Sequence, residues 1–357
     1  MDRRTLLKTG LATTAGGLLI PAVGGLTNEA TARPRVNRVL ARDLRTPWGI
    51  AFLPGGNALV GERDSGRIYK VRKSGGRHLI GRVPNVAGGG SIGGEGGLLG
   101  LALSPHFRRD HWLYAYMSTR NDNRVVRMRY NNGQLGPTRV ILKGIPTNVH
   151  HNGGGLAFGP GGLLYVSTGD AESSTAAQNK RSLGGKVLRM TPDGEVPQGN
   201  PFGNYTWSFG HRNPEGITFG PNGTLWSSEF GEHKYDELNR IVRGHNYGWP
   251  RVEGKDGPGG YHDPFVQFPT EACSPSGVAI ANGRAWLGAL AGTSLYSVRL
   301  SGPHRRTKRR FFNGDFGRIR SVAAAPDGSL WITTSNHDGR ASSSHPNDDR
   351  VIRVRLG

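Results

Sequence analysis

The stretch Gly155-Leu-Ala-Phe-Gly-Pro-Gly-Gly-Leu-Leu-Tyr165 contains two short apolar segments joined by a turn of proline and glycine. Proline fixes φ near the value that an early turn position needs, and glycine adopts positive φ without steric cost. Apolar segments of this length with such a turn between them are typical of a β-hairpin. The stretch therefore predicts two antiparallel strands within residues 155–165.

The same pattern occurs six times, and it sets the architecture. The copies cover residues 49–60, 100–105, 155–165, 216–226, 277–286 and 321–331. A third apolar segment often follows, at residues 67–71, 186–190, 295–298 and 351–355. A unit of antiparallel strands with an irregular period of roughly 45–60 residues is typical of radially arranged sheets. We therefore predict an all-β chain folded as a six-bladed β-propeller; a large β-sandwich with chance similarity between its turns is the alternative.

Composition and charge limit the classes of partner. The 357 residues include 57 glycines, as many tight turns require, and carry a formal net charge of +20. Such a charge favours anionic surroundings, such as a cell-surface polymer or an acidic redox partner; a solvated basic surface without a partner is the alternative. We expect no nucleic acid, because the basic residues are scattered and are not interleaved with stacking aromatic residues. The single cysteine, Cys273, excludes an intrachain disulfide and a zinc site built on cysteine pairs.

Residues 1–32 have the features of a twin-arginine export signal rather than of a folded segment. Arg3 and Arg4 form the arginine pair, residues 11–26 are mildly apolar, and the Ala-Thr-Ala sequence at residues 30–32 fits a cleavage site. The many glycine, threonine and alanine residues make the apolar stretch a weak membrane helix. We predict an exported protein, extracellular or in the cell envelope, whose mature propeller domain covers residues 33–357 without a transmembrane segment.

Polar and charged residues precede four of the predicted inner strands. In a propeller, the loops at one end of the inner strands converge on a central pocket, so these side chains are expected to meet there. Cationic groups at such a place are costly to desolvate unless an anion compensates them, and the guanidinium fork suits carboxylates. The candidate residues at this pocket are Glu95, His150, His151, Arg212, Asn213, Arg318 and Arg320.

Longer motifs at the same positions point to a family. The most specific ones are Gly94-Glu-Gly-Gly-Leu-Leu-Gly100, His151-Asn-Gly-Gly154, Gly210-His-Arg-Asn-Pro-Glu-Gly216, Asp236-Glu-Leu-Asn-Arg-Ile241 and Gly244-His-Asn-Tyr-Gly-Trp-Pro250. With these motifs in this order, the chain resembles the soluble PQQ-dependent glucose and aldose sugar dehydrogenases over residues 36–356. The resemblance implies a six-bladed propeller that oxidises the anomeric carbon of an aldose to a lactone. It also implies PQQ and calcium as cofactors and an external electron acceptor as a partner.

The resemblance assigns a role to each candidate residue. His151 matches the general base that takes the proton from the anomeric hydroxyl, and Arg212 matches the arginine that stabilises charge on the quinone oxygens. Cofactor contacts are implied for Glu95, His150, Asn213, Arg318 and Arg320, the last two at the carboxylates of PQQ. Oxygen ligands of calcium are implied in two sites: the carbonyls of Gly231 and Glu232 for the ion that bridges to PQQ, and Glu237 with the carbonyl of Tyr247 for a structural ion.

Two positions depart from the family pattern. Ala291 stands where the family usually carries a lysine that contacts the quinone, and His150 stands where an acid can occur. The first departure favours an alternative function, a non-catalytic propeller that binds carbohydrate or protein through its basic surface. A calcium-dependent lactone or ester hydrolase is a third candidate, but it would need several carboxylate and asparagine side chains around the metal ion. The arginines and histidine expected at the pocket favour the dehydrogenase.

Overall fold

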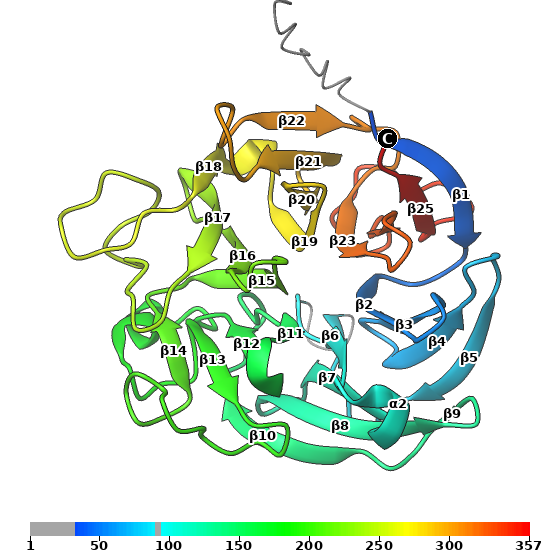
Figure 1. The fold of residues 1–357 in the computed structure, drawn as a ribbon, viewed down its shortest axis with the longest axis horizontal. Helices are drawn as coiled ribbons and strands as arrows, with labels where there is room; N and C mark the ends of the chain where they lie inside the picture. Colours follow the sequence, from blue (N-terminus) through cyan, green and yellow to red (C-terminus); the bar gives the residue numbers. More distant parts are fainter. Residues whose placement is uncertain (1–32, 90–93) are drawn as a thin grey trace, which may run out of the picture. The chain divides into compact units, whose positions relative to one another are not determined.

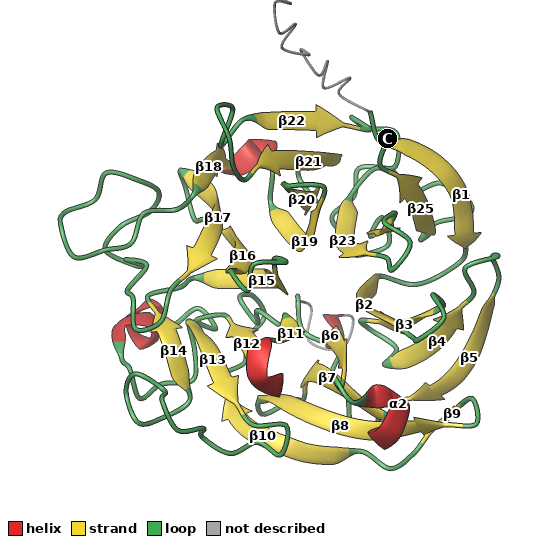
Figure 2. Cartoon of the chain, in the orientation of Figure 1, coloured by secondary structure: helices red, strands yellow, loops and turns green. Residues whose placement is uncertain are grey.

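The computed structural model describes residues 33–89 and 94–357; the predicted export signal lies outside these residues. Six antiparallel sheets are arranged radially around a central axis, with strands β2, β6, β11, β15, β19 and β23 innermost (Figure 1). Figure 2 shows that strands dominate the chain and that helices are confined to single short turns. The prediction of an all-β, six-bladed propeller is confirmed.

The blades follow one another along the chain, and each uses four main strands. The first three are β2 (Pro47–Phe52), β3 (Ala58–Glu62), β4 (Arg67–Val71) and β5 (Arg77–Arg82); β6 (Leu98–Leu103), β7 (Trp112–Ser118), β8 (Asn123–Asn131) and β10 (Arg139–Ile145), with β9 (Gln134–Leu135) paired to β8; and β11 (Leu156–Phe158), β12 (Leu164–Thr168), β13 (Lys186–Met190) and β14 (Thr206–Phe209). The next two are β15 (Asn213–Phe219), β16 (Leu225–Phe230), β17 (Tyr235–Ile241) and β18 (Val266–Pro269); and β19 (Pro275–Ala281), β20 (Arg284–Ala289), β21 (Ser294–Arg299) and β22 (Lys308–Phe311). The short helical turns are α2 (Phe107–Asp110), η1 (Pro160–Gly162), η2 (Ser174–Gln178) and η3 (Thr270–Ala272).

The sixth blade combines the two ends of the propeller domain. Its inner strands are β23 (Ile319–Ala324), β24 (Leu330–Thr334) and β25 (Val351–Arg355). The outermost strand is β1 (Arg35–Ala41), which pairs antiparallel with β25 (Figure 1). Because this blade contains strands from both ends of the domain, the ring of blades is closed by backbone hydrogen bonds.

A ring of small residues lines the central channel and explains why the repeats begin with glycine. Gly49, Gly100, Gly216 and Gly277 lie in the inner strands of their blades, Gly155 directly precedes the inner strand β11, and Ser321 takes the equivalent place in the sixth blade. A Cβ atom added to Gly49, Gly100, Gly155 or Gly216 would lie 2.2–2.6 Å from a carbonyl oxygen of the following blade. The Ser321 hydroxyl instead donates a hydrogen bond to the Trp48 carbonyl of the first blade. The glycines therefore allow the inner strands to pack backbone to backbone.

This packing predicts that the Gly100→Ala substitution destabilises the propeller. The new methyl group would lie 2.2 Å from the Gly154 carbonyl oxygen, so two blades would have to separate. We expect a loss of roughly 1–3 kcal/mol in the free energy of unfolding, measured by urea denaturation. Gly259→Ala is the matched control, because a Cβ at Gly259 meets no atom within 4 Å. Equal unfolding midpoints for the two variants would contradict this account of the ring.

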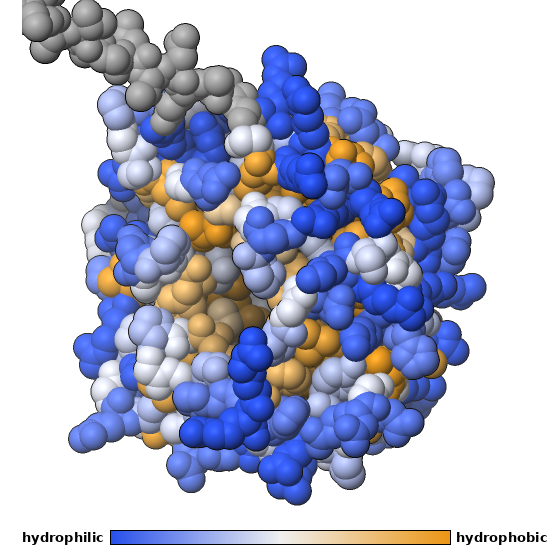
Figure 3. Space-filling model, turned by 45° about the vertical axis from the view of Figure 1, so that its right-hand side comes forward, coloured by the Kyte–Doolittle hydropathy of each residue, from blue (hydrophilic) through white to orange (hydrophobic). Residues whose placement is uncertain are grey.

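The hydrophobic core lies between neighbouring blades rather than within one layer. One cluster, for example, joins Trp48 of the first blade to Leu99 and Tyr116 of the second and Leu156 and Leu188 of the third. On the face shown in Figure 3, hydrophilic residues predominate, and apolar residues gather mainly in the hollow of the surface. Within the described part of the chain, no helix is long and apolar enough to cross a membrane.

Candidate functional site

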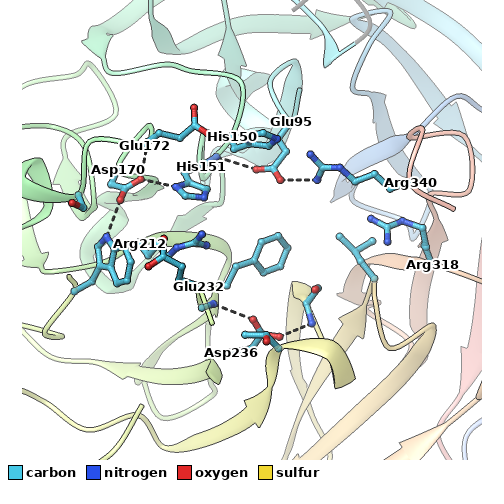
Figure 4. A pocket seen from close by; sticks show the side chains of 17 residues that line it. Glu95, His150, His151, Asp170, Glu172, Arg212, Glu232, Asp236, Arg318 and Arg340 are labelled. Atoms are coloured by element: carbon cyan, nitrogen blue, oxygen red, sulfur yellow. Dashed lines mark hydrogen bonds and ion pairs between the residues drawn. The ribbon is translucent and has the colours of Figure 1, made fainter. Parts of the chain in front are cut away.

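A cavity of about 690 Å³ lies where the predicted site residues converge. Its size is within the range of cofactor and substrate pockets. Figure 4 shows Arg318 and Arg340 entering it from one side, and His151 with Asp170 on the opposite side. The lining residues are Glu95, His150, His151, Asp170, Glu172, Ser174, Arg212, Phe230, Gly231, Glu232, Asp236, Trp249, Thr270, Ser274, Leu290, Arg318 and Arg340.

His151 is held in one orientation by a buried carboxylate. Its Nδ1 lies 2.8 Å from Oδ1 of Asp170, and the other oxygen of Asp170 accepts a hydrogen bond of 2.8 Å from the indole N–H of Trp249. An ionised Asp170 places the proton of a neutral imidazole on Nδ1 and leaves Nε2 as the acceptor. The backbone of His151 has a φ of 57°, a sparsely populated conformation for a residue with a side chain. The pocket therefore contains an oriented histidine suited to accept a proton.

Lys186 supports the segment that carries Asp170. Its ammonium group, wholly buried, donates to the carbonyl oxygens of Ala176, Ala177 and Gly184 at 2.6–3.0 Å. These three carbonyls satisfy the three donors of the ammonium group. The contacts fix the loop after β12, from which Asp170 reaches His151.

Glu95 links two walls of the pocket. Its carboxylate accepts the backbone N–H of His151 at 3.0 Å and a guanidinium N–H of Arg340 at 2.7 Å. Burial opposes ionisation of Glu95, but the contacts with Arg340 and His151 outweigh it and hold the pKa of the carboxyl below its usual value. Asn213 supports this arrangement from outside the cavity: it is buried, accepts the N–H of Gly153 at 2.9 Å and donates to Glu95 at 3.5 Å.

His150 lies at the exposed rim beside His151. Its Nδ1 is 2.8 Å from the carboxylate of Glu172, and both side chains are more than a third exposed. A pair at the open rim is accessible to the hydroxyl groups of a ligand. The structure thus places His150 next to the pocket, but on its solvent side.

Arg212 lines the pocket and differs from Arg318 and Arg340 in forming no ion pair with the described residues. Its guanidinium carbon lies 5.4 Å from the centre of the Trp249 ring, and its backbone N–H binds Glu229 at 2.6 Å. The Nε atom of Arg212 is buried and has no hydrogen-bond partner. Among residues 33–89 and 94–357, none forms an ion pair with this guanidinium. A buried cationic donor left unsatisfied by the protein favours an anionic ligand at this place.

The two arginines of the sixth blade have different positions, which corrects one prediction. Arg318 lines the pocket and pairs with Asp338 at 2.9 Å. Arg320 is only 3% exposed, does not line the pocket, and pairs with Glu215 at 3.3 Å and Asp338 at 3.2 Å. Alternation along a strand suggested that both would face one ligand. Of the two, only Arg318, just before β23, reaches the cavity. Arg320 points instead to the buried carboxylates of Glu215 and Asp338 and neutralises them.

The turn between β16 and β17 directs its carbonyl groups away from the carboxylate of Glu253. One carboxylate oxygen of Glu253 accepts four consecutive backbone N–H groups, those of residues 232–235, at 2.8–3.0 Å. In a trans peptide the C=O group points opposite to the N–H group. The carbonyls of Gly231 and Glu232 therefore point away from Glu253, and both residues line the pocket. Asp236 fixes the start of the turn by accepting the N–H of Gly231 at 3.0 Å.

The predicted ligands of the second calcium ion lie outside the pocket, in a buried polar cluster. Glu237 accepts hydrogen bonds from Asn239 at 2.9 Å and from the N–H of Gly254 at 2.8 Å. Burial and the neighbouring Glu229 carboxylate raise the pKa of Glu237 to about 8. Oδ1 of Asn239 is buried and has no hydrogen-bond partner among the residues that the structure describes, and Tyr247 is also buried. No cluster of three histidine, cysteine or acidic side chains with metal-binding geometry occurs in the described ranges.

Several site residues were not predicted from the sequence. The residues that orient or neutralise the predicted groups are Asp170, Glu172, Trp249, Glu253, Asp338 and Arg340. Asp170 and Asp338 follow the second strands of their blades, so the position after such a strand was the available signal. Arg340 brings a cation into the pocket, whereas Ala291 is an exposed alanine next to the lining residue Leu290.

The central pocket of this six-bladed propeller brings together His151, oriented by a buried carboxylate, and Arg212, which forms no ion pair within the described residues. The chain belongs to the glucose/sorbosone dehydrogenase family, whose model matches residues 44–343. It is similar to the PQQ-bound aldose sugar dehydrogenase of Streptomyces coelicolor, with 45% identity, a TM-score of 0.86, and coverage of 91% of this chain and 98% of the other.

Two curated relatives show the same kinship. The chain is 27% identical to the aldose sugar dehydrogenase YliI of Escherichia coli (strain K12), over 86% of this chain and 92% of the relative. It is 30% identical to the quinoprotein glucose dehydrogenase B of Acinetobacter calcoaceticus over 63% of this chain. That match spans about half of the Acinetobacter protein, 54% of its length.

Proposed function

We propose that the protein is a PQQ- and calcium-dependent dehydrogenase that oxidises the anomeric carbon of an aldose to a lactone and passes the electrons to an external acceptor. The observation that carries this proposal is the presence in one cavity of His151, oriented by Asp170, and of Arg212, whose buried Nε has no partner among the described residues. Names of similar proteins, two aldose sugar dehydrogenases and a quinoprotein glucose dehydrogenase, support the reaction class.

The residues of the pocket fit PQQ, a flat quinone with three carboxylates. Among the described residues, three arginines line the cavity, and Arg212 has no ion-pair partner in that part of the chain. Trp249 and Phe230 supply aromatic surface on the same lining. Guanidinium groups bind carboxylates through paired hydrogen bonds, and aromatic rings suit a flat ligand. The donor set therefore matches a planar polyanion.

Each residue of the pocket has a separate role in the proposed oxidation of the sugar. When bound, PQQ supplies the two-electron acceptor. Nε2 of His151 accepts the proton of the anomeric hydroxyl, while Asp170 stabilises the imidazolium that forms. Arg212 supplies a fixed positive charge for the negative charge that develops in the transition state. His150 and Glu172 at the rim are placed to contact the sugar hydroxyls.

Calcium fits the outward carbonyls of Gly231 and Glu232, because this ion prefers oxygen ligands. Asp236, whose carboxyl also lines the pocket, has its pKa raised by burial to about 7, and a nearby cation would favour its ionised form. In the second cluster, Glu237 and the unpartnered Oδ1 of Asn239 offer oxygen atoms next to Tyr247. A cation there would relieve the repulsion between Glu237 and Glu229.

Two variants should separate the two calcium sites. Glu253→Gln removes the charge that holds four N–H groups, so the Gly231 and Glu232 carbonyls should lose their alignment and the pocket site should bind calcium at least about tenfold more weakly. Glu237→Gln should weaken the second site alone. The measurement is calorimetric titration of chelator-treated protein with calcium, in which the wild type binds two ions. Loss of both sites in both variants would contradict independent sites.

We propose also that residues 1–32 direct export through the twin-arginine route and are removed after Ala32. The arginine pair Arg3-Arg4 and the small residues before position 33 support this proposal. Expression with Arg3→Lys and Arg4→Lys together should retain the protein in the cytoplasm with residue 1 or 2 at its terminus. Mass spectrometry of exported wild-type protein should give a chain that begins at Arg33.

The proposed reaction is tested by titrating the metal-free protein with PQQ in calcium buffer, followed by dye reduction with a panel of aldoses. Saturable PQQ binding and calcium-dependent dye reduction are expected. Folded protein that binds no PQQ at micromolar concentration would refute the dehydrogenase and favour the non-catalytic propeller. Binding without turnover of any aldose would refute the substrate class alone.

A further inference from the structure

A second groove, of about 500 Å³, lies at the outer edge of the fourth and fifth blades. The long loop between β17 and β18 forms one wall, and the loop between β21 and β22 forms the other. It shares no lining residue with the central pocket. Its side chains combine three arginines, two aromatic residues, a histidine and two aspartates, namely Arg240, Arg305, Arg306, Tyr261, Phe265, His262, Asp256 and Asp263.

Two neighbouring arginines in this groove make cation–π contacts with the same aromatic ring. The guanidinium carbons of Arg305 and Arg306 lie 4.9 and 5.3 Å from the ring centre of the buried Phe265. Cation–π contacts of this kind hold guanidinium groups in place without neutralising them. Within the described residues, neither arginine nor Arg240 across the groove has an ion-pair partner. Three like charges therefore share one depression, and two of them, those of Arg305 and Arg306, are held against the Phe265 ring.

The other wall adds groups that suit a sugar rather than a bare anion. Tyr261 and His262 present partly buried rings, and Asp256 and Asp263 are exposed acceptors for hydroxyl groups. Neither aspartate forms an ion pair with the arginines in the part of the chain that the structure describes. Burial, His245 and Arg240 lower the pKa of His262, as expected in a positive environment. Rings, hydroxyl acceptors and guanidinium groups together match a saccharide that carries acid groups.

The groove lies at the end of the strands opposite to the central pocket. β17 starts near the pocket residues Gly231 and Glu232, and Arg240 is near its far end, about 17 Å along the strand. β20 ends beside Leu290 of the pocket, and β21 runs back antiparallel before the loop with Arg305 and Arg306. A polymer bound here would leave the central pocket open to solvent.

We propose that this groove binds an acidic polysaccharide and so holds the protein on a polyanionic glycan. The charge of +20 supplies long-range attraction, and the groove supplies the specific contacts. This inference does not depend on the oxidation of aldoses. It goes further than a generally basic surface, because it assigns the binding to named residues at one edge of two blades.

The test is binding of the full-length protein to immobilised polygalacturonate at 0.15 M salt, with neutral dextran as a second surface. Arg305→Ala with Arg306→Ala should weaken binding to polygalacturonate at least about tenfold. The matched control is Arg108→Ala with Arg109→Ala, another pair of adjacent exposed arginines, which should change binding by less than about twofold. Equal losses in both double variants would overturn the proposal, since they would show attraction by net charge alone.

A second comparison tests the sugar specificity. Tyr261→Ala should weaken binding to polygalacturonate but not to inorganic polyphosphate, which has the charge without the sugar rings. If Tyr261→Ala leaves polygalacturonate binding unchanged, the saccharide assignment is wrong. Dye reduction with an aldose, or the thermal unfolding midpoint if the protein oxidises none, should be the same in the groove variants and the wild type. If a groove variant lost both polygalacturonate binding and dye reduction or thermal stability, the groove would not be independent of the central pocket.

Discussion

Replacing His151 with alanine is expected to lower kcat for aldose oxidation by a factor of about 10²–10⁴, the usual contribution of a general base. Nε2 of His151 faces the pocket because Nδ1 is committed to Asp170 at 2.8 Å. Alanine at this position leaves no group to accept the anomeric proton. PQQ binding should persist, because the arginines of the lining remain. Steady-state dye reduction and an absorbance titration with PQQ measure the two effects separately.

Two further variants show whether the loss comes from proton transfer. Asp170→Asn should also lower kcat strongly, because the amide can donate to Nδ1 and so put the imidazole proton on Nε2, and because it no longer stabilises the charged imidazole. His150→Ala is the matched control: it removes the neighbouring histidine, which pairs with Glu172 at the rim. It should change KM more than kcat. A His151→Ala variant with the turnover of the wild type would refute the assignment of the base.

Much of the fold could be predicted because each blade repeats its own local chemistry. The turns after Phe158 and Phe219 form because proline and glycine meet their backbone requirements, whatever the rest of the chain does. The closure of the ring was not predictable in this way. β1 pairs with β25, more than 300 residues later, and no local pattern in residues 35–41 marks that partner. Long-range pairing depends on the whole ring.

The site was predicted in its positions but less well in its contacts. Residues in front of the inner strands do meet at the pocket, because the propeller brings those loops together. Arg320 was misplaced because its partner, Glu215, lies 105 residues earlier in another blade, and only the folded structure shows that this carboxylate needs a cation. Asp170 and Glu253 were missed for the same reason. Both act by accepting hydrogen bonds from N–H groups elsewhere in the chain, and these contacts cannot be read from the sequence.

Replacing Arg212 with methionine should have the second largest effect, a loss of about 10²–10³ in kcat together with weaker binding of PQQ. Within the described residues Arg212 forms no ion pair, so its guanidinium is available to a ligand anion, whereas Arg318 is already engaged by Asp338. Methionine keeps much of the packing against Trp249. Titration with PQQ and dye reduction at saturating PQQ distinguish lost affinity from lost turnover.

Arg318→Met is the matched control, since it also removes an arginine from the lining. Arg318 pairs with Asp338, and after the substitution that carboxylate still has Arg320 at 3.2 Å. Either variant removes one positive charge, but Arg318 is already engaged by Asp338, so we expect weaker PQQ binding, by about tenfold or less, with kcat within a few-fold of the wild type. Equal losses of kcat in the two variants would mean that turnover depends on the number of arginines in the cavity and not on Arg212 in particular. A much larger loss for Arg212 would show that the arginine without a protein partner is the one that stabilises the transition state.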